Sequence, residues 1–209
     1  VLLETGKSFF TTHGGIAHDD LIGKPEGSAV SSTGNMIYLA LRPLLTDFVL
    51  SMPRGAAVIY PKDAAAIVGF ADIFPGATVV EAGVGSGALS CSLIRAIGST
   101  GHLHSFERRE DFAKIAQKNV KTFFGELPNN WDVHLGDLQV EAAKLSDQSV
   151  DRVILDMLAP WECIDEVARI LKPGGVLMVY VATTTQMSKV VEDVRTSKGF
   201  TDPHAEELI

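Results

Sequence analysis

The chain of 209 residues has few cysteines, no long hydrophobic run and a shortage of basic side chains. Its longest apolar stretch, residues 176–182, is far shorter than the roughly 20 residues that cross a bilayer. Because no basic segment followed by an apolar one opens the chain, we expect neither a secretory signal nor a membrane partner. Cys91 and Cys163 fall among apolar positions, which favours small core residues in a reducing compartment over a disulfide or metal site. These features predict a cytoplasmic protein.

The charge balance is acidic, with 26 Asp and Glu against 18 Lys and Arg. A net charge of −8 has the wrong sign for a nucleic-acid binder, because phosphate contacts need Lys and Arg. Local basic patches matter more than the sum, so this balance lowers the expectation of an RNA substrate without excluding it. A hydrophobic content of 46% is enough for a sizeable core and argues against disorder.

From residue 78 onward, strand and helix patterns alternate along the chain. This alternation predicts an α/β fold with a doubly wound sheet. The expected strands lie near residues 78–82, 102–106, 131–135, 151–156 and 176–181, with a sixth at 204–209. The expected helices lie near residues 88–97, 109–124, 138–145, 160–171 and 184–198.

Residues 1–50 differ from the rest, because turn signals separate short runs rich in Gly, Thr and aromatic residues. We expect a small N-terminal β domain over 1–50 and the α/β domain over 51–209. The chain starts at Val1 and ends inside an expected strand, so we expect both domains to be truncated at those ends. His13, His18, Asp19 and Asp20 match no standard ligand spacing, and we expect no metal.

A glycine-rich loop follows the strand expected at 78–82. Glu81 ends the apolar run, and Gly83, Gly85 and Gly87 alternate with small residues before a helical pattern begins. Glycines allow the backbone to approach a ligand, and the free N–H groups of the first helical turn point into the same space. The pattern Gly83-x-Gly85-x-x-Ala88 also satisfies the degenerate dinucleotide fingerprint, so the loop alone does not separate NAD from S-adenosylmethionine.

An acid stands at the end of each of the first four expected strands: Glu81, Glu107, Asp137 and Asp156. In such sheets the ligand lies beyond the carboxyl ends of the strands. Glu107 follows Gly83 at the spacing that lets an acid reach ribose hydroxyls, and Asp137 is placed to accept from an adenine amino group. A sulfonium cation tolerates these acids, whereas a pyrophosphate would be repelled, so we favour S-adenosylmethionine.

Each acid also has an ordinary structural explanation. Glu81 could cap a helix or form a salt bridge, and Glu107 could pair with the arginines that follow it. Asp137 could be the N-cap of the next helix. All four acids in order along one sheet edge are harder to explain in this way.

The segment after the fourth long strand suggests the methyl acceptor. Asp156 could accept a hydrogen bond from the exocyclic amine of an adenine and orient N1 toward the methyl group, and its charge would stabilise the cationic product. It could also act as a general base. Tyr60 could stack on a base taken out of its stack, although ordinary packing is the commoner role. Trp161 is equally a wall of that pocket or a core residue.

Four segments together make the sequence similar to a known family: residues 59–65, 81–89, 155–162 and 174–186. They resemble the bacterial tRNA (adenine-58-N1)-methyltransferases, which modify the T-loop of tRNA. The resemblance covers nearly the whole chain. It implies a Rossmann-like class I methyltransferase domain, a small N-terminal β domain and a homotetramer that uses S-adenosylmethionine.

The resemblance also implies the site residues. Asp156 and Tyr60 are expected to address the target adenine. Phe112 falls where relatives line the cofactor with a polar side chain. The expected cofactor contacts are Glu81, Gly83, Gly85, Ser86, Gly87, Ala88, Leu89, Glu107, Arg108, Phe112, Asp137, Leu138 and Asp156.

Two other functions stay open. One is a methyltransferase for a small molecule or a protein side chain, which would share the fold. The other is a non-catalytic partner subunit that binds tRNA, which would be expected to lose the glycine loop or Asp156. Grooves between the subunits of a tetramer could gather the basic residues Arg42, Arg54, Lys62, Lys114, Lys118 and Lys121.

Overall fold

A computed structural model describes residues 1–207 of the chain, and it divides the chain into two compact units. The first spans Val1–Leu44 and the second begins at Leu45, six residues before the expected boundary between 50 and 51. The difference is α1 (Leu45–Ser51), whose Val49 packs with Val58 and Ala88 of the larger unit.

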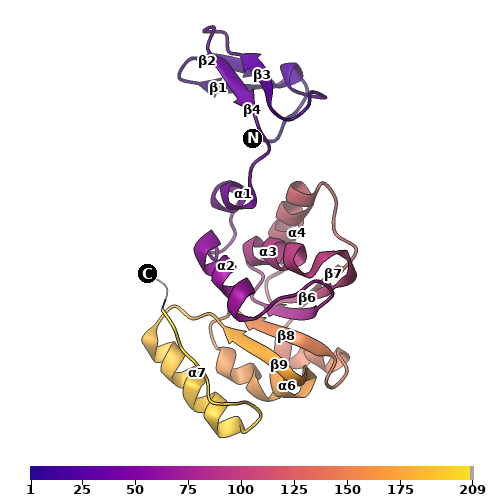
Figure 1. Cartoon of the computed structure of the whole chain (residues 1–209), viewed down its shortest axis with the longest axis vertical. Coiled ribbons are helices and arrows are strands. Elements are labelled where there is room, and N and C mark those ends of the chain that lie inside the picture. Colours follow the sequence, from indigo (N-terminus) through magenta and orange to yellow (C-terminus); the bar gives the residue numbers. More distant parts are fainter. Residues whose placement is uncertain (208–209) are drawn as a thin grey trace. The chain divides into compact units, whose positions relative to one another are not determined.

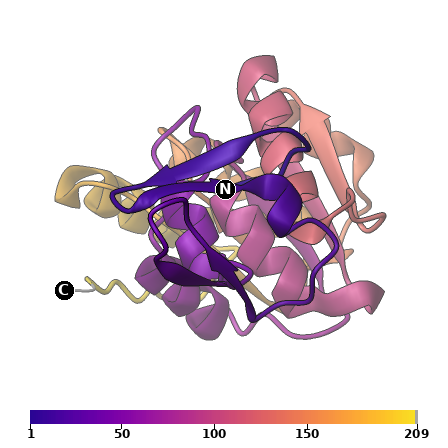
Figure 2. The same ribbon diagram turned by 90° about the horizontal axis from the view of Figure 1, so that it is seen from above.

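The first unit consists of two antiparallel hairpins, which can be traced in indigo in Figure 2. One joins β1 (Ser8–Thr11) to β2 (Gly14–Ala17), and the other joins β3 (Ser28–Ser31) to β4 (Ile37–Ala40). A short turn, η1 (His18–Asp20), follows β2. The side chains of η1 hold the start of the chain, because His18 Nδ1 accepts from the Glu4 N–H and Asp19 accepts from the Gly6 N–H.

The second unit is built on a five-stranded parallel sheet with the strand order β7-β6-β5-β8-β9 (Figure 1). The strands are β5 (Thr78–Ala82), β6 (His102–Glu107), β7 (Trp131–Leu135), β8 (Val150–Leu155) and β9 (Leu171–Val179). The order of the strands reverses next to β5, so the loop after β5 lies at the switch point of the sheet.

Helices cover both faces of this sheet (Figure 1). One face packs against α2 (Pro61–Phe70), α3 (Ala88–Ile97) and α4 (Glu110–Phe124), with η2 (Gly98–Thr100) after α3. The other packs against α5 (Leu138–Glu141), η3 (Ala142–Lys144), η4 (Pro160–Cys163), α6 (Ile164–Ile170) and α7 (Thr184–Ser197). Strands buried on both faces explain why the sequence shows continuous apolar runs rather than alternation. Among residues 1–207, no helix combines the length and apolarity needed to span a membrane.

The doubly wound α/β prediction is confirmed, and five expected strands occur near their predicted places. β9 starts five residues earlier than expected, because residues 172–175 bulge between the Val150–Leu171 and Arg152–Val176 pairs. The helix expected at 160–171 is a 3-10 turn followed by α6. The prediction of a sixth strand at 204–209 is wrong for residues 204–207, which form no strand. Positions 208–209 lie outside the described residues.

Candidate active site

A cavity of about 630 Å³ lies where the carboxyl ends of the five parallel strands meet. Every strand contributes to it: Ala82 ends β5, Glu107 ends β6, and residues just after β7, β8 and β9 complete the wall. Residues 56–59, which precede α2, close another side. The volume falls in the range of small-molecule and cofactor sites.

Two glycines of the loop after β5 are required by contacts within the protein. Gly83 has φ +92°, and a Cβ there would lie 1.7 Å from the carbonyl oxygen of Asp156. A Cβ on Gly87 (φ +79°) would lie 3.2 Å from the backbone of Ala116 in α4. Gly83 and Gly85 line the cavity, whereas Gly87 does not. Gly83 thus lets the loops after β5 and β8 touch, which places Asp156 beside the glycine loop.

Two polar side chains fasten the segment before α2 to this loop. Ser86 Oγ accepts from the Gly55 N–H at 3.1 Å and donates to the Ala56 carbonyl at 3.2 Å. Asn119, buried on α4, donates from Nδ2 to the carbonyls of Pro53 and Ser86 at 2.8 and 2.9 Å. These bonds hold the wall formed by residues 56–59.

Glu107 is buried and holds two backbone N–H groups. Its Oε2 accepts from Gly85 and its Oε1 accepts from Arg109, both at 3.0 Å. The side chain of Arg109 pairs with Asp111, and that of Arg108 pairs with Asp137. The surface ion pair between Glu107 and the arginines that follow it therefore does not form. The carboxylate is therefore fixed at the edge of the cavity with its charge partly balanced by amide donors.

Asp137 stands at the N-cap position of α5, but its side chain does not cap that helix. Its Oδ1 accepts instead from Nε of Arg108, and both residues line the cavity. Asp137 raises the pKa of Arg108 further above its ordinary value through this pair. An ion pair thus joins the ends of β6 and β7 at the cavity.

Glu81 is fully buried and does not line the cavity. Ser90 and Ser105 both donate to its Oε2 at 2.7 Å, so it neither caps a helix nor forms a salt bridge. Burial raises the pKa of Glu81 to about 7, and the two serine hydroxyls oppose the shift. Its Oε1 is buried without a hydrogen-bond partner among residues 1–207.

Asp156 follows β8 and lines the cavity. Its N–H donates to the Ala82 carbonyl at 2.8 Å, which continues the sheet pairing by one residue beyond the end of β8. Burial raises the pKa of Asp156 to about 6. A carboxyl group of this kind, in a cavity and with a pKa moved toward neutrality, is typical of a functional group.

Two predicted residues carry aromatic rings. Tyr60 precedes α2, is 52% exposed and does not line the cavity, although its neighbour Ile59 does. Phe112 does line it, and the Arg109 guanidinium lies 3.7 Å from the centre of its ring. The ring of Phe112 is thus already covered on one face by a cation.

The structure brings most of the predicted site residues together around one cavity. Glu81, Gly87 and Tyr60 are the three that it does not place in the lining. The predicted residues in the lining are Gly83, Gly85, Ser86, Ala88, Leu89, Glu107, Arg108, Phe112, Asp137, Leu138 and Asp156.

Sequence reasoning missed two polar lining residues. The hydroxyl of Tyr180 donates to Asp63 Oδ2 at 3.3 Å, and burial together with Asp63 raises its pKa. Gln186 donates from Nε2 to the Leu158 carbonyl, which ties α7 to the loop after Asp156. Thr183-x-x-Gln186 is a capping pattern that could have drawn attention to Gln186, whereas no local signal marks Tyr180.

The cavity fits the cofactor expected from the sequence. S-adenosylmethionine joins an adenosine to a positively charged sulfonium and an amino-acid tail. Glu107, Asp137 and Asp156 supply carboxylates suited to hydroxyl, amino and cationic groups, and Phe106 and Leu138 supply apolar walls.

Comparisons with known proteins agree on one family. Residues 35–208 match the family described as "tRNA methyltransferase complex GCD14 subunit", and residues 1–30 match "TrmI-like N-terminal". The chain is 36% identical over 191 residues to tRNA (adenine(58)-N(1))-methyltransferase TrmI of Thermus thermophilus, covering 91% of this chain and 73% of the relative. It is 30% identical to the Methanocaldococcus jannaschii enzyme named for adenines 57 and 58, covering 100% of this chain and 80% of that one.

Two solved methyltransferase structures are similar to the chain over most of its length. The crystal structure of tRNA (m1A58) methyltransferase TrmI from Aquifex aeolicus matches with a TM-score of 0.78 and 29% identity, covering 94% of this chain and 75% of that one. A SAM-dependent O-methyltransferase from Thermotoga maritima matches with a TM-score of 0.84 and 31% identity, covering 94% and 72%. The two proteins are named for methylation of different atoms, a nitrogen in the first and an oxygen in the second.

Proposed function

The chain belongs to the tRNA methyltransferase family of the GCD14 subunit and TrmI, and we propose that it methylates N1 of adenine 58 in the T-loop of tRNA. S-adenosylmethionine, when bound, supplies the methyl group. The observation that carries this proposal is the placement of Asp156, which lines the cavity beside the glycine loop at the switch point of the sheet.

We assign the cofactor side to the residues after β5, β6 and β7. The Glu107 carboxylate, held by the N–H groups of Gly85 and Arg109, is the acceptor for the ribose hydroxyls. Asp137 is the acceptor for the adenine amino group of the cofactor, and its pair with Arg108 sets its orientation. Leu138 and Phe112 line the cavity as apolar walls.

We assign the acceptor side to Asp156. Its carboxylate would accept a hydrogen bond from the exocyclic amine of the target adenine and so orient N1. Methylation at N1 leaves a positive charge on the ring, and a carboxylate that accepts from the exocyclic amine would lower the energy of the charged product. The exposed ring of Tyr60, one residue from the lining, is the stacking surface for a flipped base.

The direct test is methyl transfer to unmodified tRNA. The protein is incubated with labelled methyl donor and tRNA, the tRNA is digested to nucleosides, and the labelled nucleoside is identified. We expect 1-methyladenosine, lost when adenine 58 is replaced by another base. Mapping the label also shows whether position 57 is modified, as the name of the archaeal relative suggests for that enzyme.

The alternative acceptor is an oxygen, because the similar Thermotoga maritima protein is described as an O-methyltransferase. A labelled ribose-methylated nucleoside would support that alternative. Labelling of small molecules or protein in place of tRNA would support the broader methyltransferase reading. Absence of any transfer with bound cofactor would contradict the enzyme proposal.

We further propose a homotetramer that acts in the cytoplasm. Family resemblance supports the tetramer, and a tRNA substrate supports the compartment. Light scattering on the purified chain should give four times the mass of one chain, and a monomer would contradict the proposal.

A further inference from the structure

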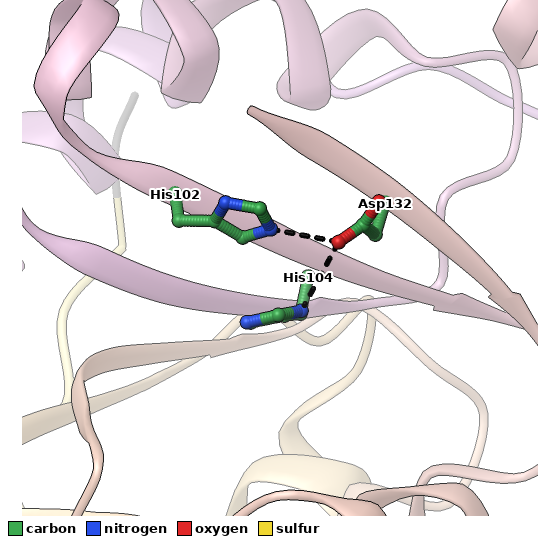
Figure 3. A group of neighbouring side chains, drawn as sticks. All are labelled: His102, His104 and Asp132. Atoms are coloured by element: carbon green, nitrogen blue, oxygen red, sulfur yellow. Dashed lines mark hydrogen bonds and ion pairs between the residues drawn. The ribbon is translucent and has the colours of Figure 1, made fainter. Parts of the chain in front are cut away.

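Three histidines and an aspartate share one face of the sheet on β6 and β7, and none of the four lines the cavity, although the ring of His134 stacks on Phe106, which does. His102 and His104 are two residues apart on β6, so their side chains leave the same face. Asp132 of β7 is paired in register with His104, and His134 with Phe106. Figure 3 shows that Asp132 reaches across from β7 toward both His102 and His104.

The donor atoms of three of these residues converge. His102 Nε2 lies 2.8 Å and His104 Nδ1 lies 4.0 Å from the same oxygen, Asp132 Oδ2. One donor atom of each residue lies within 4.8 Å of the others. Tetrahedral Zn²⁺ with bonds of about 2.0–2.1 Å places its ligands roughly 3.3 Å apart, so small side-chain rotations suffice to reach that spacing.

Hydrogen bonding explains only part of this cluster. It accounts for the His102–Asp132 contact, but a separation of 4.0 Å is too long for a hydrogen bond from His104. His134 Nε2 also approaches His104 Nδ1, at 3.4 Å. Four donor-bearing side chains therefore gather around a space that hydrogen bonds between them do not fully use.

We propose that His102, His104 and Asp132 bind one divalent transition-metal ion of the Zn²⁺ type, with His134 beside them as a further donor. Imidazole nitrogens select zinc, copper, nickel or cobalt over Mg²⁺ and Ca²⁺, which prefer all-oxygen ligands. The ion would join β6 to β7, which stands at one end of the described sheet order. Its role would thus be to hold that strand in place.

The site would act independently of methyl transfer. His102 begins β6 and Glu107 ends it, and five steps along a parallel strand span about 16 Å. None of the four side chains lines the cavity. Zn²⁺ should therefore raise the midpoint of thermal unfolding without altering the rate of methyl transfer.

The test is equilibrium dialysis of the whole chain against Zn²⁺, with Co²⁺ as a spectroscopic probe and excess Mg²⁺ as competitor. We expect one bound ion per chain, visible absorption from Co²⁺ bound to nitrogen and oxygen ligands, and no displacement by Mg²⁺. Asp132→Asn and His102→Gln should each weaken the binding of Zn²⁺. Loss of an outer-shell partner costs roughly 10- to 100-fold in metal affinity, so loss of a direct ligand should cost at least that much.

The matched control is His204→Gln, which breaks another histidine–carboxylate pair, that of His204 with Glu206 at 2.7 Å. This variant should bind Zn²⁺ as the parent does. Asp132 is exposed, so Asp132→Asn should fold, and its thermal midpoint in the presence of a chelator verifies this. The proposal is overturned by absence of a bound ion, by full binding in Asp132→Asn, or by equal losses in His204→Gln.

Discussion

At the scale of single residues, the carboxylates predicted for the site stand in different surroundings. Glu81 is fully buried and accepts from two serine hydroxyls, Glu107 is held by amide donors, and Asp156 is half-buried at the cavity. Burial raises the pKa of Glu81 to about 7 and of Asp156 to about 6. A carboxyl group with a raised pKa thus lies in the interior of the sheet at Glu81 and in the lining of the cavity at Asp156.

Asp156 should give the enzyme a pH dependence near its own pKa of about 6. The proposed role needs the carboxylate form, so kcat should rise with pH through about 6 and level off above it. Asp156→Asn should lower kcat by about 10²-fold or more and leave the Kd for tRNA nearly unchanged. Single-turnover rates across pH and a separate binding titration check both points, and a parallel loss of tRNA affinity would contradict the assigned role.

Gly83 should tolerate no side chain. Gly83→Ala places a Cβ against the Asp156 carbonyl at a positive φ, and we expect a cost of about 3 kcal/mol or more in unfolding free energy. Gly69→Ala is the matched control, because that helical glycine has open space around it. It should stabilise the protein by about 0.5–1 kcal/mol. Denaturant unfolding measures the change in unfolding free energy for both variants. Equal changes would contradict the close contact at Gly83.

At the scale of elements, strand ends carry the site and the contacts between elements orient it. β5 brings Glu81 into the interior of the sheet, where Ser90 of α3 and Ser105 of β6 hold it. α7 reaches the acceptor loop through Gln186. Ser90 lies on the helix that directly follows β5, whereas the contact of Gln186 with Leu158 joins segments 28 residues apart.

Glu81 should make the protein less stable as pH rises. Its pKa is higher in the folded chain (about 7) than its ordinary value of 4.5, so the folded state binds the proton more tightly. The stabilisation is full below about pH 4.5 and is lost as pH rises through 7, by about 3 kcal/mol for this shift. Glu81→Gln should flatten this dependence, as measured by urea unfolding at several pH values. If the free energy of unfolding of Glu81→Gln depended on pH as it does in the parent, the raised pKa of Glu81 would not be the cause of that dependence.

Gln186 should position the acceptor loop. Gln186→Glu keeps an acceptor for the Ala182 N–H and the Thr183 hydroxyl but loses the Nε2 donor to the Leu158 carbonyl. We expect kcat to fall about 10- to 100-fold through misplacement of the loop, with little change in thermal stability. Gln117→Glu, on the exposed side of α4, is the control for the added charge. Equal kcat values in the two variants would argue against a positioning role.

At the scale of the whole molecule, an acidic protein must still bind a polyanion. Lys114, Lys118 and Lys121 are exposed on α4 at positions i, i+4 and i+7, which place them on one face of the helix. Such a face provides local positive charge within a chain of net charge −8.

Binding of tRNA should therefore weaken steeply as salt is added, since each neutralised phosphate releases counterions. The double variant Lys118→Gln/Lys121→Gln should weaken the binding of tRNA and reduce the slope of log K against log salt. The control is Lys189→Gln/Lys198→Gln, on and just after α7, which should change neither the affinity nor the slope. Titrations at several salt concentrations measure these slopes. A flat response in the parent protein would mean that phosphate contacts do not drive binding.

The sequence by itself determined the class of fold and the kind of ligand. Alternation of strands and helices is encoded locally, and acids at strand ends can be read from spacing, because parallel strands bring those ends to one edge. The glycine loop, Glu107, Asp137 and Asp156 were found in this way. The two extra lining residues and the histidine cluster were not, although His102-x-His104 and Asp132-x-His134 stand on neighbouring expected strands.

Only the tertiary structure decided what each side chain touches. It sealed Glu81 away from the cavity, set Gly83 against Asp156 and joined Tyr180 to Asp63. It also paired Arg108 with Asp137 and brought Asp132 to His102. These contacts link segments far apart in sequence, and they depend on register, burial and packing between elements. Periodicity along the chain specifies which face a residue occupies, whereas packing specifies its partner.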